Sequence, residues 1–353
     1  MLQASLVRAR AELPRPAGNA TGEWSAREAI AIAVSDGSQV GRAEAAPLPR
    51  MSSETLEMTE RALRAIPWAE VDPEIEDPLT LAAILVGDDV PSARFAVEAA
   101  LLDLVGRARG LSVAAMLAEH EPAGSISAAA LLDDLDTAVV RATVALSAGA
   151  GALKVKIGRP GRVEAEMAML RALRKELGSD VPIRADANRS LRDPSDPRIA
   201  VLAEIGCELL EEPFSLEQLF ETPALPIPVG LDESLSRDPV RALRALEIGR
   251  AEAVVLKPAL LGGIGRALAI AEAAKARGAR AIVSHLFDAP RSFAACCHLA
   301  LALAGAPGGA REVHGLSRYA GLDQWVDEHG APTPVPRMIG AFRIERPDGG
   351  GLG

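Results

Sequence analysis

From about residue 125 onward, short apolar runs alternate with longer stretches in which apolar residues recur every three or four positions. The short runs fit buried strands, and the longer stretches fit amphipathic helices. The runs, with the polar residues that end them, are ALKVKI, PIRADA, CELLEEP, PVGLDES, AEAVVLKP and ARAIVSH. Equivalent positions of successive runs, from Lys156 to Ser284, lie 21 to 30 residues apart. A strand-plus-helix module repeated at that interval is typical of an α/β barrel or a doubly wound sheet.

The placement of polar residues distinguishes these two folds. Nearly every apolar run in this part of the chain ends in charged or polar residues. In a barrel, functional groups come from the C-terminal ends of several strands around one mouth. A doubly wound sheet concentrates them at one switch point instead. Polar ends on six successive strands therefore favour the barrel.

The first hundred or so residues predict a separate α+β unit. Ranges 30–34 and 41–46 are strand-like and flank the turn Asp36-Gly37-Ser38,. Range 95–108, FAVEAALLDLVGRA, predicts an amphipathic helix because its apolar residues recur at three- and four-residue spacing,. The tail contains the strand-like AFRIE, and we expect it to return to the N-terminal unit. The expected division is an α+β domain over 1–112 with a C-terminal return over 333–353, and a barrel over 113–332.

Composition limits the classes of function. A hydrophobic content of 49% suffices for a large core, and a formal charge of −10 argues against a nucleic-acid partner, which normally binds a basic face,. The odd, sparse set Cys207, Cys296 and Cys297 cannot form a disulfide framework,. The N-terminus has arginines where a signal peptide needs an apolar stretch. The longest nearly uncharged run, 292–306, is too short to span a membrane,. We therefore expect a cytoplasmic protein.

Lys154 and Lys156 are the first candidates for chemistry. They lie two positions apart in a predicted strand, so both side chains point to the same face,. If that face is the barrel interior, mutual repulsion is expected to lower both pKa values, as a lysine acting as general base requires. The alternative is a pair of exposed lysines on a solvated strand face. Lys257, between AVVL and Pro258, would place a third cation on the opposite wall, or could be structural.

Three neighbouring strands each end in a carboxylate. Asp186 lies within the polar series Arg184, Asp186, Asn188, and the next two strands end in Glu211 and Asp232. One inward carboxylate from each strand makes an all-oxygen site suited to Mg²⁺ or Mn²⁺. Three converging carboxylates without a cation would repel each other strongly. Each carboxylate taken alone could instead cap the helix that follows it.

Two further motifs favour structural roles. Gly262-Gly263-Ile264-Gly265 precedes a predicted helix but does not complete a G-x-G-x-x-G phosphate cradle, so it predicts a tight turn,. Cys296-Cys297-His298 lies in an Ala/Leu-rich helix, where packing is the expected role. No H-x-x-x-H pair predicts zinc, and no G-x-S-x-G motif predicts a hydrolase,.

The ordered motifs K-x-K, D-A-N, E-E-P, D-E-S and K-P resemble the enolase superfamily, in its muconate-lactonizing subgroup. The resemblance spans nearly the whole chain. It implies a (β/α)7β modified TIM barrel capped by an α+β domain built from both chain ends. It also implies Mg²⁺, with Mn²⁺ as the alternative, held by Asp186, Glu211 and Asp232. Lys154, Lys156 and Lys257 would be the catalytic lysines.

Within the subgroup, AAPLPRMSSET at 45–55 is similar to a stretch of the o-succinylbenzoate synthase family, as are Arg184 and the run HGLS at 314–317. That family dehydrates a 2-succinyl-6-hydroxycyclohexadiene carboxylate to o-succinylbenzoate in menaquinone biosynthesis. One departure is clear. Where the family shows a serine-rich S-S-x-x-E segment, this chain has Ser284-His285-Leu286-Phe287-Asp288. Dipeptide epimerase and N-acylamino-acid racemase activities occur on the same scaffold and stay open.

The synthase resemblance implies roles for individual residues. Lys156 would remove the α-proton and then protonate the departing hydroxide, and Lys257 would stay protonated. In an epimerase, the same two lysines would alternate as base and acid. Arg184 would pair with a substrate carboxylate, with Asn188, Ser284 and His285 as further contacts to a small-molecule carboxylate. A catalytically inactive binding barrel is the remaining alternative. The oligomeric state is not predicted.

Overall fold

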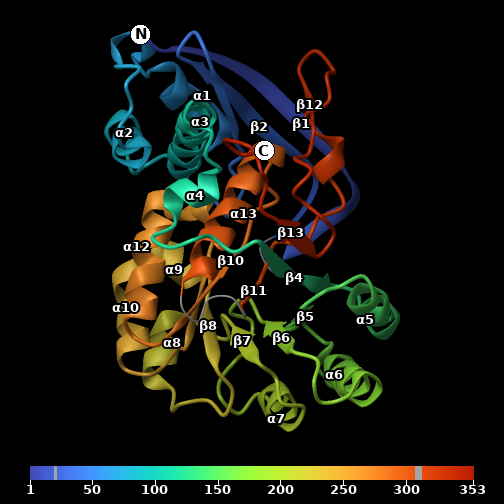
Figure 1. Cartoon of the computed structure of the whole chain (residues 1–353). Helices are drawn as coiled ribbons and strands as arrows, with labels where there is room; N and C mark the ends of the chain where they lie inside the picture. The colour runs from blue at the N-terminus through green and yellow to red at the C-terminus, as the bar shows by residue number, and fades with distance from the viewer. Residues whose placement is uncertain (20–21, 307–311) are drawn as a thin grey trace.

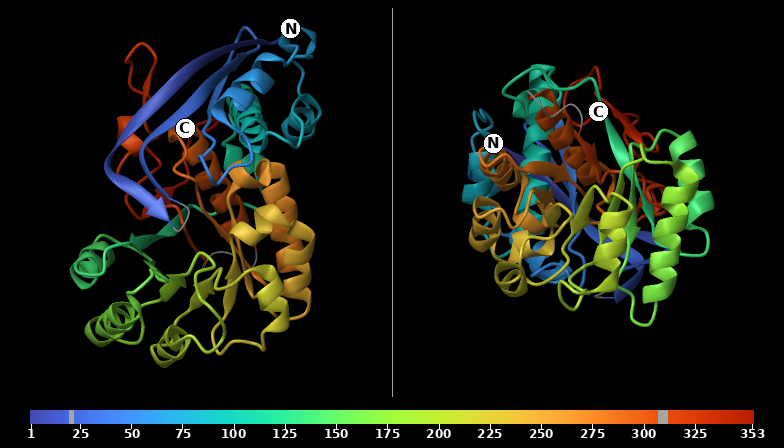
Figure 2. Two further views of the ribbon diagram at one scale, coloured as in Figure 1. Left: turned by 180° about the vertical axis from the view of Figure 1, so that it is seen from behind. Right: turned by 90° about the horizontal axis from the view of Figure 1, so that it is seen from below.

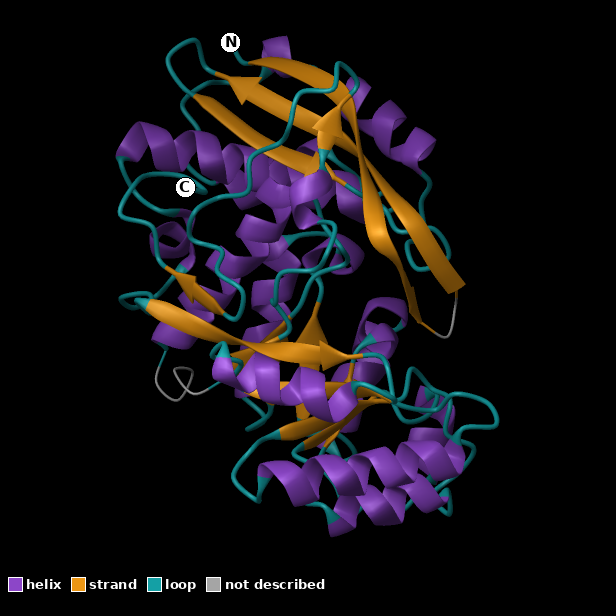
Figure 3. Ribbon diagram, turned by 90° about the vertical axis from the view of Figure 1, so that its right-hand side faces the viewer, coloured by secondary structure: helices purple, strands orange, loops and turns teal. Residues whose placement is uncertain are grey.

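The computed structural model describes residues 1–19, 22–306 and 312–353 and contains two parts, an antiparallel cap and a parallel barrel (Figure 1). Figure 3 shows the antiparallel strands as a separate layer beyond the barrel. The cap sheet has the order β12-β1-β2-β3. Its strands are β1 (Gln3–Asn19), β2 (Gly22–Ser35), β3 (Val40–Ala45) and β12 (Val326–Asp327). The cap helices are α1 (Leu56–Arg64), α2 (Pro78–Leu85), α3 (Pro91–Arg109) and α4 (Val113–Leu117), with a 3₁₀ turn, η1 (Trp68–Glu70).

The long hairpin of β1 and β2 is held by a continuous antiparallel register from Gln3 opposite Ser35 to Glu12 opposite Ala26. The pairing shifts between Glu12 and Ala17 and then continues to the tip. A shift of this kind bends a strand and increases its twist. The tip of the hairpin thereby reaches the barrel mouth, as the blue ribbon shows in the left panel of Figure 2.

Helix α3 is the central helix of the cap, and it is not amphipathic as the sequence pattern predicted. Its residues from Phe95 to Gly106 are all buried, including the charged Glu98 and Asp103. The two carboxylates are tolerated because each accepts backbone hydrogen bonds from another part of the chain,. The amphipathic prediction was wrong because β3, α2 and the barrel helices α11 and α12 pack around this helix.

The barrel contains eight parallel strands in the described residues, in the order β4-β5-β6-β7-β8-β9-β10, with β11 on the other side of β4. The strands are β4 (Ser125–Leu132), β5 (Ala152–Lys156), β6 (Ile183–Asp186), β7 (Leu209–Glu211), β8 (Val229–Leu231), β9 (Ala253–Leu256), β10 (Arg280–Val283) and β11 (Val313–His314). A bridge between Ser284 and Gly315 joins the two ends of the sheet. This closure, seen end-on in the right panel of Figure 2, confirms the predicted barrel,.

Helices connect successive strands and form the outer layer. They are α5 (Ala138–Ser147), α6 (Val163–Leu177), α7 (Pro197–Glu204), α8 (Leu216–Glu221), α9 (Glu233–Arg237), α10 (Pro239–Glu247), α11 (Pro258–Leu261), α12 (Ile264–Lys275) and α13 (Pro290–Gly305). Seven strand–helix units followed by an eighth strand give the expected (β/α)7β arrangement for the described chain. No helix of this part of the chain is long and apolar enough to cross a membrane. Cys207, Cys296 and Cys297 are buried free thiols.

The C-terminal segment returns to both parts of the molecule. Val326 already pairs with Arg10 of β1, so the chain re-enters the cap sheet before residue 333. The predicted strand AFRIE forms β13 (Arg343–Glu345), which pairs antiparallel with β4 of the barrel. The final residues then reach the cap, where Leu352 N donates to the Asp103 carboxylate at 2.8 Å.

Two cap carboxylates hold barrel helices at their N-termini. Glu98 of α3 accepts hydrogen bonds from Ile264 N and, at 3.2 Å, from Gly265 N at the start of α12. Glu44 of β3 accepts from Arg291 N and Ser292 N of α13, both at 3.0 Å. Because the first N–H groups of a helix have no acceptor within the helix, these contacts satisfy them and fix the cap on the barrel.

A carboxylate of the cap lies against the glycine turn before α12. Gly262 and Gly263 have φ values of +87° and +120°, and a Cβ at Gly263 would collide with the Glu98 carboxylate. The amides at the start of α12 are therefore used by Glu98 rather than by a phosphate. This confirms the predicted tight turn.

The interface carboxylates give a pH-dependent stability. Burial raises the pKa of Glu44 and of Glu98 to about 7. The folded protein then holds these protons more tightly than the unfolded chain, so the stabilisation present below pH 4.5 is lost as the pH rises through 7,. The side chain of Glu98→Gln stays neutral at every pH. We therefore expect its free energy of unfolding, relative to that of wild type, to increase by up to about 3 kcal/mol as the pH rises from 5 to 8. Urea unfolding at both pH values measures this difference.

The control for that measurement is Glu57→Gln, at an exposed position on α1. Its stability relative to wild type should not change between the two pH values. A constant difference for Glu98→Gln across the same range would contradict a neutral Glu98 in the folded protein.

Candidate active site

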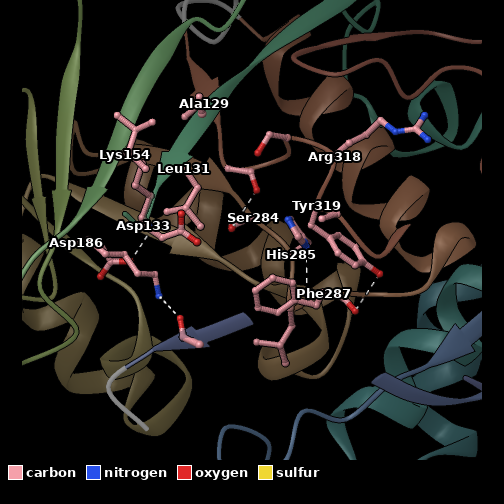
Figure 4. A pocket seen from close by; sticks show the side chains of 18 of the residues that line it. Ala129, Leu131, Asp133, Lys154, Asp186, Ser284, His285, Phe287, Arg318 and Tyr319 are labelled. Carbon is pink, nitrogen blue, oxygen red and sulfur yellow. Dashed lines mark hydrogen bonds and ion pairs between the residues drawn. The ribbon is translucent and has the colours of Figure 1, made fainter. Parts of the chain in front are cut away.

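The C-terminal ends of β5, β6 and β7 bring two lysines and two carboxylates together. Lys156 is paired in register with Asp186, and Asp186 with Glu211. Neighbouring strands lie about 4.8 Å apart, so these side chains are adjacent on the inner face. Lys154 Nζ lies 3.1 Å from Asp186 Oδ2 and also contacts the Glu211 carboxylate. Figure 4 shows Lys154 and Asp186 side by side in the cavity.

The next two strands contribute a second ion pair. Asp232 follows β8, Lys257 follows β9, and Lys257 Nζ lies 2.5 Å from Asp232 Oδ2. Strands β5 and β9 are four positions apart in an eight-strand barrel, so Lys257 is opposite Lys156. Both lysines line one cavity. The sequence-based expectation of amines on two walls is therefore consistent with the topology.

The three predicted metal ligands reach the same end of the barrel, but they are not assembled around one point. Among residues 1–19, 22–306 and 312–353, no three His, Cys, Asp or Glu side chains form a ready-made metal site. The ammonium groups of Lys154 and Lys257 contact the carboxylate oxygens instead.

The donor chemistry of these carboxylates fits a hard divalent cation. Asp186, Glu211 and Asp232 are all buried. Burial, together with repulsion from Asp186 and Asp232, raises the pKa of Glu211 above its usual range. A cation bound at these oxygens would relieve that repulsion.

The two lysines of β5 differ in electrostatic environment. Burial lowers the pKa of Lys156, and the charges of Lys154 and Lys257 lower it further. For Lys154 burial acts in the same direction, but the attraction of Asp186 and Glu211 outweighs it, so its pKa is raised. The prediction that repulsion lowers both values was wrong for Lys154. The sequence spacing showed the two lysines but not which of them the carboxylates contact.

Glu212, the second acid of E-E-P, has a role that the sequence did not indicate. Its carboxylate accepts hydrogen bonds from Asp232 N at 2.8 Å and Ser234 N at 3.0 Å. Glu212 adopts a φ of +45°, which turns its side chain under the neighbouring strand end. It thereby orients the backbone that carries Asp232.

Asn188 lies in the cavity wall, but its amide is engaged by the protein. Asn188 Nδ2 donates to Glu233 Oε1 at 2.9 Å. Its backbone N–H also contacts the Asp186 carboxylate at 3.2 Å. Asn188 lines the cavity, so it stays a proposed substrate contact, although Glu233 holds its side-chain amide.

Arg184 does not face the cavity, and its predicted role in binding a substrate carboxylate is corrected. Its guanidinium is buried and donates to Glu208 at 2.7 Å, Glu312 at 2.9 Å and the Val313 carbonyl at 2.6 Å. Arg184 lies two residues before Asp186, one layer deeper in the barrel, and its long side chain reaches residues that precede β7 and β11,. The two-residue spacing predicted the inward face but not the depth.

Replacing Arg184 by methionine should destabilise the protein without altering the active site. Breaking its buried ion pairs is expected to cost about 3 kcal/mol of unfolding free energy. The Michaelis constant should stay within about twofold of wild type, because Arg184 does not contact the cavity. Urea unfolding and steady-state kinetics check the two parts. Arg171→Met, which breaks an exposed ion pair with Glu204, is the control and should change stability by less than about 0.5 kcal/mol,. A large rise in the Michaelis constant for Arg184→Met would restore Arg184 as a substrate ligand.

The cavity has a volume of about 570 Å³ and lies between the barrel mouth and the cap. The cap contributes Leu13, Pro16, Trp24, Leu48 and Met51 to its lining. Lys156 Nζ donates to the Gly18 carbonyl, at 3.3 Å, near the tip of the β1–β2 hairpin. The cap therefore reaches the lysine at the inner end of the cavity, and its apolar residues exclude water from one wall.

Ser284 and His285 both line the cavity. Ser284 Oγ donates to the Gly315 carbonyl at 3.2 Å, where the barrel closes. Burial, with the charges of Lys257 and Lys154, lowers the pKa of His285 to about 3, so the imidazole is neutral. Tyr319, which also lines the cavity, and Arg27, which is buried and donates to the Leu286 carbonyl, were not predicted from sequence. Arg27 carries no motif that distinguishes it from a surface arginine of β2.

Comparison with known proteins relates the chain to enolase-like proteins. The family model described as "Enolase C-terminal domain-like" matches residues 137–353. A hydrophobic dipeptide epimerase from Roseobacter litoralis is 31% identical over 214 residues, which cover 58% of this chain and 60% of the epimerase. An o-succinylbenzoate synthase from Aliivibrio fischeri is 28% identical over 282 residues, 78% of each chain. The match therefore spans about three fifths of the Roseobacter protein and more of the Aliivibrio one.

A solved structure gives the same architecture. The dipeptide epimerase from Enterococcus faecalis, complexed with Mg and the dipeptide L-Leu-L-Tyr, superposes with a TM-score of 0.79 at 21% identity, covering 99% of this chain and 98% of that one. At this identity the likeness shows the fold. The family match, the closed barrel and the cap together identify the chain as a member of the enolase superfamily.

Proposed function

We propose that this chain removes a proton from the carbon beside a substrate carboxylate, as an o-succinylbenzoate synthase. The substrate would be a 2-succinyl-6-hydroxycyclohexadiene carboxylate, and the products o-succinylbenzoate and water. The observation that carries the proposal is the pair Lys156 and Lys257, which line one cavity from opposite sides of the barrel. Asp186, between them, lines the same cavity.

Lys156 is the proposed base. Burial and two neighbouring ammonium groups favour its neutral form, which can accept a proton,. Lys156 would take the α-proton, and the electrons of that C–H bond would form the new double bond as the C–O bond breaks. The same ammonium would then protonate the departing hydroxide. Lys257, ion-paired with Asp232, would stay protonated beside the developing negative charge,.

Asp186, Glu211 and Asp232 would hold Mg²⁺, or Mn²⁺, which supplies electrostatic stabilisation of the negative charge that develops on the substrate carboxylate. Support for this assignment comes from the three buried carboxylates and the raised pKa of Glu211. A structurally similar dipeptide epimerase was solved with Mg bound.

The charges of the cavity favour the synthase over an epimerase acting on a dipeptide with a free ammonium group. Among the described lining residues, Asp133 is ion-paired with Arg141 and Asp186 with Lys154. Glu233 uses one oxygen for Asn188, and its other oxygen is buried from solvent. Lys257 and Arg318 are likewise ion-paired, with Asp232 and Asp323, so Lys156 is the cation of the described lining that lacks an ion pair. A substrate ammonium would thus find an unpaired cation and no unpaired carboxylate open to solvent among the described residues of this wall. A dicarboxylate such as the synthase substrate suits these charges better.

The cap segment 45–55 gives a second line of support. Leu48 and Met51 of this segment line the cavity. Leu48 N donates to Ser52 Oγ at 2.9 Å, which closes the segment into a compact turn. The residues that resemble the synthase family therefore lie at the proposed substrate.

An epimerase is the second candidate, because two lysines on opposite walls also suit removal of a proton from one face and its return on the other. Purified protein with Mg²⁺ should be assayed with the synthase substrate and with a panel of dipeptides. The expected result is a higher kcat/KM for dehydration. Rescue of a bacterial mutant that lacks the synthase, and so makes no menaquinone, would support the same conclusion. Dominant dipeptide epimerisation would overturn it.

Lys257→Arg separates the two candidates within one protein. An epimerase needs Lys257 as a base, so the substitution should abolish epimerisation. The synthase needs only a cation at this position, so some dehydration should be retained.

A further inference from the structure

His285 is enclosed by three aromatic rings at the inner wall of the cavity. Its ring stacks on Tyr319, with centroids 5.4 Å apart and planes 21° from parallel. Phe293 and Phe287 present their edges at centroid distances of 4.7 Å and 5.8 Å. Figure 4 shows His285, Tyr319 and Phe287 as one group on the side of the cavity away from Lys154. This packing leaves the imidazole a single orientation.

One hydrogen bond fixes the tautomer of this imidazole. Phe287 N donates to His285 Nδ1 at 3.0 Å. A ring nitrogen that accepts a hydrogen bond carries no hydrogen, so a neutral His285 carries its hydrogen on Nε2. Burial, with the neighbouring charges of Lys257 and Lys154, lowers the pKa of the imidazole and so favours its neutral form.

The backbone that supplies this hydrogen bond is itself held by the cap. Phe287 has a φ of +55°, a conformation that non-glycine residues rarely adopt without support,. Arg27 of β2 donates to the carbonyls of Phe287 at 3.3 Å and Leu286 at 3.4 Å. The same guanidinium donates to the carbonyls of Ala46 at 2.6 Å and Pro47 at 3.0 Å. Arg27 therefore positions two walls of the cavity, the turn after β10 and the loop after β3.

The second ring nitrogen remains available to a ligand. His285 is partly exposed to the cavity, and Nε2 makes no hydrogen bond to another described residue. Several polar atoms of the described chain lack a partner and are sealed from solvent, but His285 Nε2 is not one of them. In Figure 4 this nitrogen points away from Phe287, on the side of the ring toward Ser284.

We propose that His285 is a specificity residue that presents a neutral Nε2–H donor to an uncharged oxygen acceptor of the substrate. The inference rests on the proposed function, in which that acceptor is the ketone carbonyl of the succinyl arm. Arg27 and the Phe287 turn are the positioning groups that hold the donor. A neutral donor next to Lys257 favours a carbonyl oxygen and disfavours an amine or ammonium group at the same place.

The tautomer is tested first, on the free protein and without any substrate. Nitrogen-15 NMR of histidine-labelled protein should show His285 protonated on Nε2 only, from pH 6 to 9. In Arg27→Lys, which retains the charge but not the four-carbonyl contact, the Nδ1–H form should become detectable. A wild-type His285 protonated on Nδ1 would overturn the proposal, and an unchanged tautomer in Arg27→Lys would remove Arg27 from it.

The contact is tested by calorimetry with two ligands. One is o-succinylbenzoate, and the other is its analogue 2-(3-carboxypropyl)benzoate, in which CH₂ replaces the ketone carbonyl. His285→Phe keeps the aromatic packing and lacks the donor. It should weaken binding of o-succinylbenzoate about 10-fold, and change binding of the analogue by less than about twofold. His285→Gln, which keeps a donor, should recover part of the loss.

The outcomes separate this inference from the proposed function. If His285→Phe weakens the binding of both ligands equally, His285 has only a packing role, and the inference is overturned. If the wild type binds L-Ala-L-Glu but not o-succinylbenzoate, the proposed function fails. The inference is then judged on that dipeptide, whose peptide carbonyl should make His285→Phe bind about 10-fold more weakly, and an unchanged affinity would overturn it.

Discussion

Replacing Lys156 by methionine is expected to lower kcat/KM by about 10³-fold or more, because general-base catalysis contributes about 10² to 10⁴ and the proposed base also returns its proton to the leaving group. Methionine has a similar length and an apolar side chain, so it retains the packing of the buried stem. Within the described residues, the Lys156 ammonium donates one hydrogen bond, to the Gly18 carbonyl. Steady-state kinetics at saturating Mg²⁺ measures the loss, with circular dichroism to confirm the fold.

The control for this prediction is Lys175→Met, at an exposed position on α6. It removes the same charge from the chain and should leave kcat/KM within about twofold of wild type. A Lys156→Met variant that retains more than a tenth of the wild-type activity would remove Lys156 from the reaction.

Removal of divalent cations should abolish activity, and Mg²⁺ should restore it. Electrostatic stabilisation by a cation supplies several kcal/mol at the transition state, and about 4 kcal/mol corresponds to roughly a 10³-fold loss of rate. Mg²⁺ should also raise the midpoint of thermal unfolding, because a ligand that binds only the folded state stabilises it. Glu211→Gln should lose both effects. Activity after treatment with EDTA, and calorimetric titration of the stripped protein with Mg²⁺, check the prediction.

A matched variant separates metal binding from general destabilisation. Glu208→Gln changes a carboxylate near the other end of the barrel, where Glu208 pairs with Arg184 and Arg280. It should lower stability and leave the response to Mg²⁺ intact. An EDTA-resistant activity would contradict the metal assignment, and an absence of both activity and Mg²⁺ binding in the wild type would support an inactive binding barrel.

The proposed cation would bind among charges that are already partly balanced by ion pairs. Three carboxylates, Asp186, Glu211 and Asp232, lie among three lysines. Lys154 and Lys257 partly balance the carboxylates, whereas Lys156 lacks a carboxylate partner within ion-pair distance in the described chain. The site therefore holds one lysine whose pKa is lowered and two whose pKa values are raised.

Much of the barrel could be predicted from the sequence, because its information is local. Six of the eight described strands, β5 to β10, are short apolar runs that end in, or are followed by, polar residues at the barrel mouth. The two-residue spacing of Lys154 and Lys156 predicted a shared face, and the repeat of strand and helix predicted the parallel order. These features depend on strand periodicity and chain direction alone, so they can be recognised without knowing the tertiary contacts.

The cap was less predictable. The 17-residue strand β1 was not assigned, although it forms the hairpin that reaches Lys156. Helix α3 was expected to have a polar face, but the barrel covers that side and Glu98 caps α12. The contact of Glu98 with α12 joins residues 166 positions apart, whereas β1 pairs with β2, the next strand of the chain.

The sequence by itself determined the polar residues at the ends of six barrel strands, their order around the mouth and the family to which the chain belongs. Only the tertiary structure decided that Arg184 binds Glu208 and Glu312 below the cavity, and that Lys154 rather than Lys156 lies between Asp186 and Glu211. It also decided that His285 Nδ1 accepts a hydrogen bond from Phe287 N. The reason is physical: a side chain's pKa, tautomer and partner depend on charges and dipoles within a few ångströms, and those neighbours come from distant parts of the chain.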